Sequence, residues 1–201
     1  AVASGYGQCL ALRADGTVAG WGRNESGQAN GALAGSNVVA IAAGGNFSLA
    51  LKESGTVVPL GAIGVPGGLS GVVAIAADFE HALALKTDGT VAAWGNDPWG
   101  QASIPVGLDG VAAIAAGKAH SLALKTDGTI MGWGANYDGQ AVAPSGTPPK
   151  GAVAIFAGSH HSLALIANGT VLGWGAGSPG SPGYGQATVP FGVRNMVALA
   201  A

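Results

Sequence analysis

The stretch HSLALKTDGTIMGWGANYDGQ, residues 120–140, decides the fold because the chain repeats it with small changes. Its Asp-Gly-Thr core, or a close variant of it, recurs at residues 15–17, 54–56, 88–90, 127–129 and 168–170. Successive copies are separated by 39, 34, 39 and 41 residues. A fixed period near 40 residues is typical of solenoids and propellers. The 201 residues are therefore expected to form one repeat array.

One repeat, residues 111–144, contains three segments with the pattern of strands. VAAIAAG is short and apolar, HSLALK alternates with the period of a half-buried strand, and TIMGWG follows the TDGT turn. Asp-Gly between two apolar runs predicts a β-hairpin with a type I′ turn, which needs positive φ at both central residues. No segment has a ten-residue helical period. The sequence predicts an all-β fold with three strands per repeat and room for a short fourth.

The first strand of each repeat is rich in Ala and Gly, as in AIAAG at 40–44 and 113–117. Such small residues suit the innermost strands of a propeller, which converge on an axis. Bulk farther out is supplied by a Trp at the end of the third strand, at Trp21, Trp94, Trp133 and Trp174. We therefore predict a β-propeller built from five blade-like repeats of about 40 residues. The expected repeats are 1–36, 37–70, 71–109, 110–150 and 151–194, with 195–201 as a closing first strand.

The repeated pattern VAxIAAGxxHSLALKxDGTVxxWGxNxxGQ resembles the repeat of the regulator of chromosome condensation superfamily. The compact period and the Ala-rich first strand resemble its bacterial branch, which includes beta-lactamase inhibitory protein II. The resemblance covers essentially the whole chain and implies a β-propeller, seven-bladed in the known members, without assigning a function. The second repeat departs from the pattern: Leu60 replaces the Trp, and the N-x-x-G-Q loop is missing. We expect a trimmed loop and a weaker outer edge there.

Each end of the chain carries a segment that aligns with the first strand of a repeat, AVASG at 1–5 and VALAA at 197–201. In a closed ring of five blades these segments would compete for one place. Two arrangements stay open: a segment of a longer repeat array, or a closed ring in which 197–201 fills the place and the first residues fray. An unpaired first strand would expose free N–H and C=O groups, so self-association through the ends is also expected.

Composition narrows the classes of partner. Eight Lys and Arg residues and a net charge of −2 do not supply the clustered basic surface that nucleic acid binding needs. No stretch approaches 18 apolar residues, so no membrane span is predicted. The single cysteine, Cys9, excludes an internal disulfide framework. A secreted or extracellular bacterial location is expected, with a cytoplasmic one left open, since the chain begins AVASGYG without a basic leader segment or an initiator Met.

Catalytic and metal-binding patterns do not stand out from the repeat. His81, His120 and His161 occupy one repeated position and are expected to be structural hydrogen-bonding residues. There is no G-x-S-x-G motif and no Cys/His cluster with zinc spacing. The glycines follow turns instead of forming a phosphate-binding loop. We therefore predict a non-enzymatic protein with no cofactor and no metal.

The loops after the first and third strands indicate a binding face. These two sets of loops differ between repeats, whereas the hairpin turns are nearly constant. Because strands alternate in direction, both sets of loops should emerge at the same end of each blade, and the turns at the other end. Aromatic rings on a rigid scaffold are typical anchors of protein interfaces. The candidate partner-binding residues are Tyr6, Phe47, Phe79, Glu80, Asp97, Trp99, Tyr137, Asp138, His160 and Tyr184.

The predicted function is a protein-binding propeller, with a beta-lactamase inhibitor-like protein as one specific form. Two alternatives stay open. One is a carbohydrate-binding propeller in which Trp99 or Tyr137 stacks on sugar rings. The other is a structural or engineered blade array with no ligand. Nucleotide exchange or chromatin binding, as in the eukaryotic relative, is disfavoured by the low Lys and Arg content.

Overall fold

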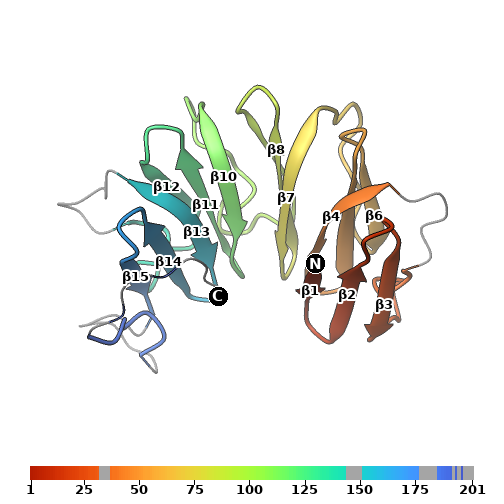
Figure 1. Ribbon diagram of the computed structural model, residues 1–201, viewed down its shortest axis with the longest axis horizontal. Coiled ribbons are helices and arrows are strands. Elements are labelled where there is room, and N and C mark those ends of the chain that lie inside the picture. The colour runs from red at the N-terminus through yellow and green to blue at the C-terminus, as the bar shows by residue number, and fades with distance from the viewer. Residues whose placement is uncertain (32–36, 144–150, 177–184, 192, 194–195, 197–201) are drawn as a thin grey trace. The chain divides into compact units, whose positions relative to one another are not determined.

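The computed structural model describes residues 1–31, 37–143, 151–176, 185–191, 193 and 196. Within these ranges it contains fifteen strands and no helix. The strands form five three-stranded antiparallel sheets, and each sheet keeps its strands in chain order (Figure 1). The prediction of an all-β chain with five blade-like repeats is confirmed. Tyr184 and the expected closing strand at 197–201 lie outside the described residues.

The chain divides into two compact units, Ala1–Asn96 and Asp97–Ala201. The first unit holds three sheets: β1 (Val2–Ser4), β2 (Gln8–Leu12), β3 (Val18–Gly22); β4 (Val38–Ala43), β5 (Phe47–Lys52), β6 (Val57–Gly61); and β7 (Val72–Asp78), β8 (His81–Lys86), β9 (Val91–Gly95). The second holds two: β10 (Val111–Ala116), β11 (His120–Lys125), β12 (Ile130–Gly134); and β13 (Ala152–Ala157), β14 (His161–Ile166), β15 (Val171–Gly175). The N-terminal residues form β1, which pairs with β2 as a first strand.

The same pairing register recurs in the sheets, which shows that the sequence repeat is a structural repeat. In the fourth sheet His120 lies opposite Gly134 and Leu124 opposite Ile130. The first strands β4, β7, β10 and β13 each shift register after their first residue pair, as between Val111 and Ala113. Such a shift inserts one extra residue and increases the local twist of the strand.

Neighbouring sheets pack large side chains against small ones. On β5, Leu49 and Leu51 pack in one cluster with Ala82 and Ala84 of β8. The opposite face of β5 presents Ala50 to a cluster that contains Leu10 of β2. In the second unit, Leu122 and Leu124 share a cluster with Ala164 of β14. The Leu face of one repeat thus fits the Ala face of the next.

The middle strands are therefore buried on both faces, which differs from the half-buried strand that the HSLALK alternation predicted. Five of the six residues are buried in β5, β8 and β11. The residues that alternate with the leucines are Ser and Ala, and these are small enough to pack against the preceding sheet. Their alternation with Leu reflects size and not exposure to solvent.

The small first strands allow close approach of backbones, as the sequence predicted. A Cβ atom added at Gly5 would lie 2.0 Å from the Gly44 carbonyl oxygen of the next sheet. One added at Gly45 would lie 2.4 Å from the Phe79 carbonyl oxygen, which instead accepts a hydrogen bond from the Gly45 N–H at 2.7 Å. Only glycine permits these contacts, because any side chain would separate the sheets.

The hairpins are present where the Asp-Gly pairs predicted them, but the turns are not type I′. The Gly16 N–H donates to the Arg13 carbonyl, and the Arg13 N–H donates to the Thr17 carbonyl. This pattern is a three-residue loop in which only Gly16 has positive φ, 75°. The Asp15 carboxylate accepts from both the Thr17 N–H and the Thr17 hydroxyl. These local hydrogen bonds hold Asp15 in an ordinary conformation, and the glycine alone takes the left-handed one.

The tryptophans at the ends of the third strands pack as predicted in three repeats. Trp133 and Trp174 are buried, and Trp94 packs against the core of the second sheet. Trp21, in the first repeat, is exposed. Leu60 occupies the equivalent place on β6, opposite Ser48, and is buried as well.

The Asp-Thr hydrogen bonds predict an acid-dependent part of the stability. In each of three turns the Thr hydroxyl, followed by the Thr backbone N–H, lowers the pKa of the Asp: Asp15, Asp88 and Asp127. A lowered pKa in the folded state gives stability that is present at neutral pH. That stability is lost as the pH falls below the usual Asp value of about 3.9 and through the folded value.

Replacing all three Asp residues with Asn should remove this acid-dependent part. Asn168 already shows that an amide oxygen accepts the same two bonds from Thr170. Urea unfolding at pH 7 and at pH 3 measures the effect. We expect wild type to lose more stability than the triple variant on acidification, and equal losses would contradict the role of the carboxylates.

Trp133→Ala should be severely destabilising, by about 3–5 kcal/mol, since it leaves a large cavity in a packed core. Leu60→Ala should cost less, because a smaller side chain is removed from the same structural place. Urea unfolding of both variants tests this. An unchanged midpoint for Trp133→Ala would show that the ring does not hold the sheets together.

Candidate functional site at the loop ends of the sheets

In each sheet the loop after the first strand lies beside the start of the loop after the third. Backbone hydrogen bonds join them, for example from the Asn96 N–H to the Glu80 carbonyl at 2.9 Å, and from the Ala135 N–H to the Ala119 carbonyl at 2.8 Å. The variable loops therefore share one end of each sheet, as predicted. We call this end the loop end.

The N-x-x-G-Q loop folds through its own side chains. In the fourth repeat the Asn136 amide oxygen accepts from the Ala141 N–H at 2.9 Å, and the Gln140 amide oxygen accepts from the Asp138 N–H at 2.9 Å. The third repeat forms the same two bonds with Asp97 and Gln101. These bonds brace the loop from inside and leave the two residues after the Asn or Asp free to vary.

The loop glutamine also joins its repeat to the next one. The Gln101 carbonyl oxygen accepts from the Trp133 indole N–H and from the Ser121 hydroxyl, both at 2.8 Å. The Gln140 carbonyl oxygen accepts from Trp174 and Ser162 in the same way, at 2.9 and 2.8 Å. We call this arrangement the glutamine bridge. It pairs buried polar groups of a loop with those of the sheet that follows, which an apolar contact could not do.

The trimmed second repeat has no glutamine bridge to the third. Ala82 stands where the fourth and fifth sheets have the bridging Ser, and the Trp94 indole N–H is buried without a hydrogen-bond partner among the described residues. A Cβ atom on Gly134 would lie 3.0 Å from Gln101 of the preceding loop, whereas the three atoms nearest to one on Gly95 all belong to Glu80 and His81 of its own sheet. The missing loop leaves this part of the seam uncovered.

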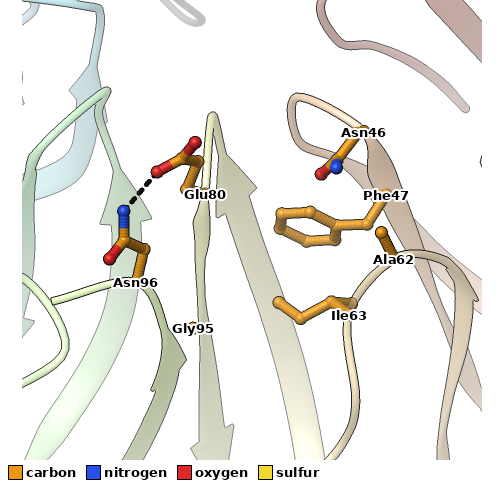
Figure 2. A pocket seen from close by; sticks show the side chains of 7 residues that line it. All are labelled: Asn46, Phe47, Ala62, Ile63, Glu80, Gly95 and Asn96. Atoms are coloured by element: carbon orange, nitrogen blue, oxygen red, sulfur yellow. Dashed lines mark hydrogen bonds between the residues drawn. The ribbon is translucent and has the colours of Figure 1, made fainter.

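A pocket of about 310 Å³ lies at that seam. Its lining residues are Asn46, Phe47, Ala62, Ile63, Glu80, Gly95 and Asn96. Figure 2 shows Phe47 and Ile63 on one side of it, and Glu80 hydrogen-bonded to Asn96 on the other. The expectation of a trimmed loop is thus met by an opening between the second and third sheets.

A second, smaller pocket of about 220 Å³ adjoins the first, since Asn46 and Glu80 line both. Its other lining residues are Tyr6, Arg23, Gly45 and Phe79. The rings of Tyr6 and Phe79 meet edge to face with centroids 6.4 Å apart, and Tyr6 is 70% exposed. The first unit therefore brings together three of the candidate residues, Tyr6, Phe79 and Glu80.

Phe79 has an unusual backbone conformation for a bulky residue, with φ of 29°. Its N–H donates to the Asp78 carboxylate, and its carbonyl accepts from Gly45 of the neighbouring sheet. Contacts of this kind are needed to hold a strained residue, and such residues cluster at functional sites. The positive φ of Phe79 therefore supports the Tyr6–Phe79 pair as part of a candidate binding site.

The second unit carries another aromatic pair. The rings of Trp99 and Tyr137 meet edge to face with centroids 5.2 Å apart, and they are 53% and 71% exposed. Beside Tyr137, the Asp138 carboxylate lies 3.4 Å from the His160 ring nitrogen Nδ1. Four of the candidate residues thus gather in this unit. Asp97 instead braces its own loop through the Ala102 N–H and the Ser103 hydroxyl.

Phe47 does not offer its ring to a partner as expected, because it is 1% exposed and belongs to the core of the second sheet. Its ring packs over Gly44 and forms only the inner wall of the larger pocket. The sequence-based selection also missed four lining residues that come from different loops: Arg23, Asn46, Ile63 and Asn96. The only signal for them was the 34-residue spacing that marks the deletion.

The repeated histidine position is structural, as predicted. His81 and His120 are fully buried, and the His120 Nε2 atom lies 2.9 Å from the Ser162 hydroxyl of the next sheet. Gln8 takes the same position in the first repeat and donates to the Gly44 and Phe47 carbonyls. Burial, and then the neighbouring His160, lowers the pKa of His161.

The described residues contain no group of three His, Cys, Asp or Glu side chains arranged to hold a metal ion. In the same part of the chain no helix has the length and hydropathy to cross a membrane.

The repeated three-stranded sheets and their glutamine bridges define a propeller-type repeat protein. Residues 1–28, 111–140 and 152–186 match the family model of the regulator of chromosome condensation (RCC1) repeat. The comparison with curated protein sequences found no match. The repeat family predicted from the sequence is thus detected in the first, fourth and fifth repeats.

Solved structures extend the similarity to about nine tenths of the chain, from 87% to 92%. Yeast RCC1 (Prp20), solved bound to Kap60, is 25% identical with a TM-score of 0.72, over 87% of this chain and 55% of that one. The ectodomain of the Physcomitrella patens receptor kinase CR4 is 26% identical with a TM-score of 0.71, over 87% and 52%. Human WBSCR16, at 22% identity and a TM-score of 0.74, covers 92% and 64% and shares the fold alone. The chain therefore spans little more than half the length of the first two relatives.

The glutamine bridge predicts different costs for removing the same indole N–H in two repeats. Trp133→Phe breaks a hydrogen bond to Gln101, whereas Trp94→Phe removes a donor that has no partner. Both variants lose similar ring area. We expect Trp133→Phe to destabilise the protein by about 1 kcal/mol more than Trp94→Phe in urea unfolding.

Ser121→Ala is the matched control for the bridge, since Ala82 already holds that position in the third repeat. It should cost about 1 kcal/mol. Equal losses for the two Trp→Phe variants would show that the indole N–H adds nothing to the seam.

Proposed function

We propose that the chain is a non-enzymatic protein-binding scaffold whose partner contacts the loop ends of the sheets. The observation that carries this proposal is the Trp99–Tyr137 pair, two large rings in mutual contact and mostly exposed. Buried at an interface, each ring would remove a large apolar area from water. Tyr and Trp are the residues most often found at the energetic centres of interfaces.

The loops that carry these rings are held in place before any partner arrives. Trp99 lies inside the loop braced by Asp97 and Gln101, and Tyr137 inside the loop braced by Asn136 and Gln140. A prearranged loop loses little conformational freedom on binding, which reduces the cost of association. The Tyr6–Phe79 pair is held by neighbouring sheets in the same manner.

The relatives support binding of proteins as the function of this fold. Yeast RCC1 was solved with Kap60, and the work on Prp20p reports its binding properties to Gsp1p and histones. We do not transfer these partners, because the loop ends of the present chain have their own residues and its net charge is −2. A beta-lactamase inhibitor is one specific form of the proposal, in which acidic and aromatic loop residues would fill the active site of the enzyme.

A double variant, Trp99→Ala with Tyr137→Ala, tests the proposal. A partner is first captured on the immobilised chain and identified, and its dissociation constant is then measured with purified components. We expect at least a hundredfold loss of affinity in the double variant, since each ring at such a centre contributes about 2 kcal/mol or more. Trp21→Ala is the control, because Trp21 is also exposed but lies on a strand.

The same measurement separates the alternatives. Unchanged affinity in the double variant, together with loss in the control, would contradict the assignment of the loop ends. Binding to glycans that disappears in Trp99→Ala, with no protein captured, would favour a carbohydrate-binding propeller. Inhibition of a beta-lactamase by wild type but not by the double variant would support the inhibitor form.

A further inference from the structure

The larger pocket of the first unit combines an apolar wall with a polar rim. Phe47, Ala62 and Ile63 supply the apolar side, from the second repeat. Asn46 lies on that side as well, and Glu80, which accepts a hydrogen bond from Asn96, supplies the polar side opposite (Figure 2). At about 310 Å³ the space is at the lower limit for small-molecule sites, so it suits a single side chain or a small group.

Glu80 is the single charged residue of this lining. Among the described residues no cationic side chain forms an ion pair with it. Arg23, which lines the adjoining pocket, pairs instead with Glu25 at 2.7 Å. The pocket therefore presents one uncompensated negative charge next to an apolar wall.

We propose that this pocket receives one lysine side chain from a protein partner. This inference rests on the proposed protein-binding function and adds the type of partner side chain that the pocket would bind. A lysine has a long apolar stem that could lie along Ala62 and Ile63, and a single positive charge that would reach the Glu80 carboxylate. The Asn46 side chain adds an amide oxygen at the same rim.

Lysine is favoured over arginine because one oxygen of the Glu80 carboxylate is already hydrogen-bonded. One oxygen of Glu80, Oε2, already accepts a hydrogen bond from Asn96. A guanidinium group binds best when both carboxylate oxygens accept in parallel, whereas an ammonium group acts as a compact point charge. The fixed Asn96 contact thus disfavours the paired geometry and leaves one oxygen for an ammonium group.

The pocket exists because the second repeat lacks the N-x-x-G-Q loop. In the fourth and fifth sheets the preceding loop covers the glycine after the Trp, at Gly134 and Gly175. At Gly95 that cover is missing, and Gly95 itself lines the pocket. A partner side chain would therefore occupy space that a loop of the chain itself fills elsewhere.

The test is an NMR titration of the full, nitrogen-15-labelled chain with the peptide acetyl-Gly-Lys-Gly-amide. The matched probe replaces lysine with norleucine, which keeps the stem and removes the charge. We expect saturable shifts of the Asn46, Glu80 and Asn96 amide signals with the lysine peptide, and at least fivefold weaker binding of the norleucine peptide. Binding should weaken as salt is added, since one ion pair drives it.

Three variants make the assignment specific. Glu80→Gln should weaken lysine-peptide binding at least fivefold, and Ala62→Phe should abolish it by filling the space while the charge stays. Glu53→Gln removes the same charge at the hairpin end of the same repeat, where Glu53 is exposed, and should change nothing. Because Ala62 and Glu80 are also exposed, both test variants should fold.

Equal binding of the norleucine peptide, or equal losses in Glu80→Gln and Glu53→Gln, would overturn the inference. Tighter binding of an arginine peptide would overturn the choice of lysine. If a protein partner depends on Trp99 and Tyr137 but the lysine peptide does not bind, this inference fails and the proposed function stands.

Discussion

The glutamine bridge is the interaction that fixes the N-x-x-G-Q loops of the second unit against its sheets. One backbone carbonyl oxygen, that of Gln101 or Gln140, accepts both an indole N–H and a serine hydroxyl from the following sheet. The glutamine side chain is turned back into its own loop, so its amide supports the loop while its carbonyl supports the seam. The bridge thus couples loop conformation to sheet packing. This coupling explains why Gln, Ser and Trp recur together in the repeat, far apart in sequence.

Loss of the bridge in one repeat has consequences in the next. When the loop of the second repeat is trimmed, the Trp94 indole N–H has no acceptor, and Ala82 replaces a serine that would have none either. The buried orphan donor costs stability. In return the seam opens into a pocket with a carboxylate at its rim. Other repeats keep the N-x-x-G-Q loop, so its loss in the second repeat is a departure from the repeat pattern. Such departures are expected at functional sites.

The two exposed aromatic pairs follow from the same design. In both, a ring from one loop meets a ring from a different repeat, Tyr6 with Phe79 and Trp99 with Tyr137. The regular spacing of the sheets within each unit brings these loops together without any contact between residues close in sequence. The scaffold therefore supplies rigid positions, and the loop residues supply the chemistry.

The sequence by itself determined the repeat, the all-β class, the position of each hairpin and the grouping of variable loops at one end of each sheet. These follow from a period near 40 residues and from local alternation, which need no tertiary information. It also selected Tyr6, Phe79, Trp99 and Tyr137 correctly as loop residues. It failed on the turn type, because the hydrogen bonds between Asp15 and Thr17 are a matter of geometry and not of composition.

Only the tertiary structure decided which faces are buried and where the pocket lies. HSLALK predicted one solvent-facing side, yet both sides are covered because Leu of one sheet packs against Ala of the next. Phe47, selected as a loop residue, begins β5 and fills the core, like the buried His81 and His120 that hold the same position in other repeats. The pocket joins Ile63 to Asn96 across two sheets, at a place defined by an absent loop. A missing segment leaves no residues for a sequence pattern to reveal, so its effect appears only when neighbouring sheets are packed together.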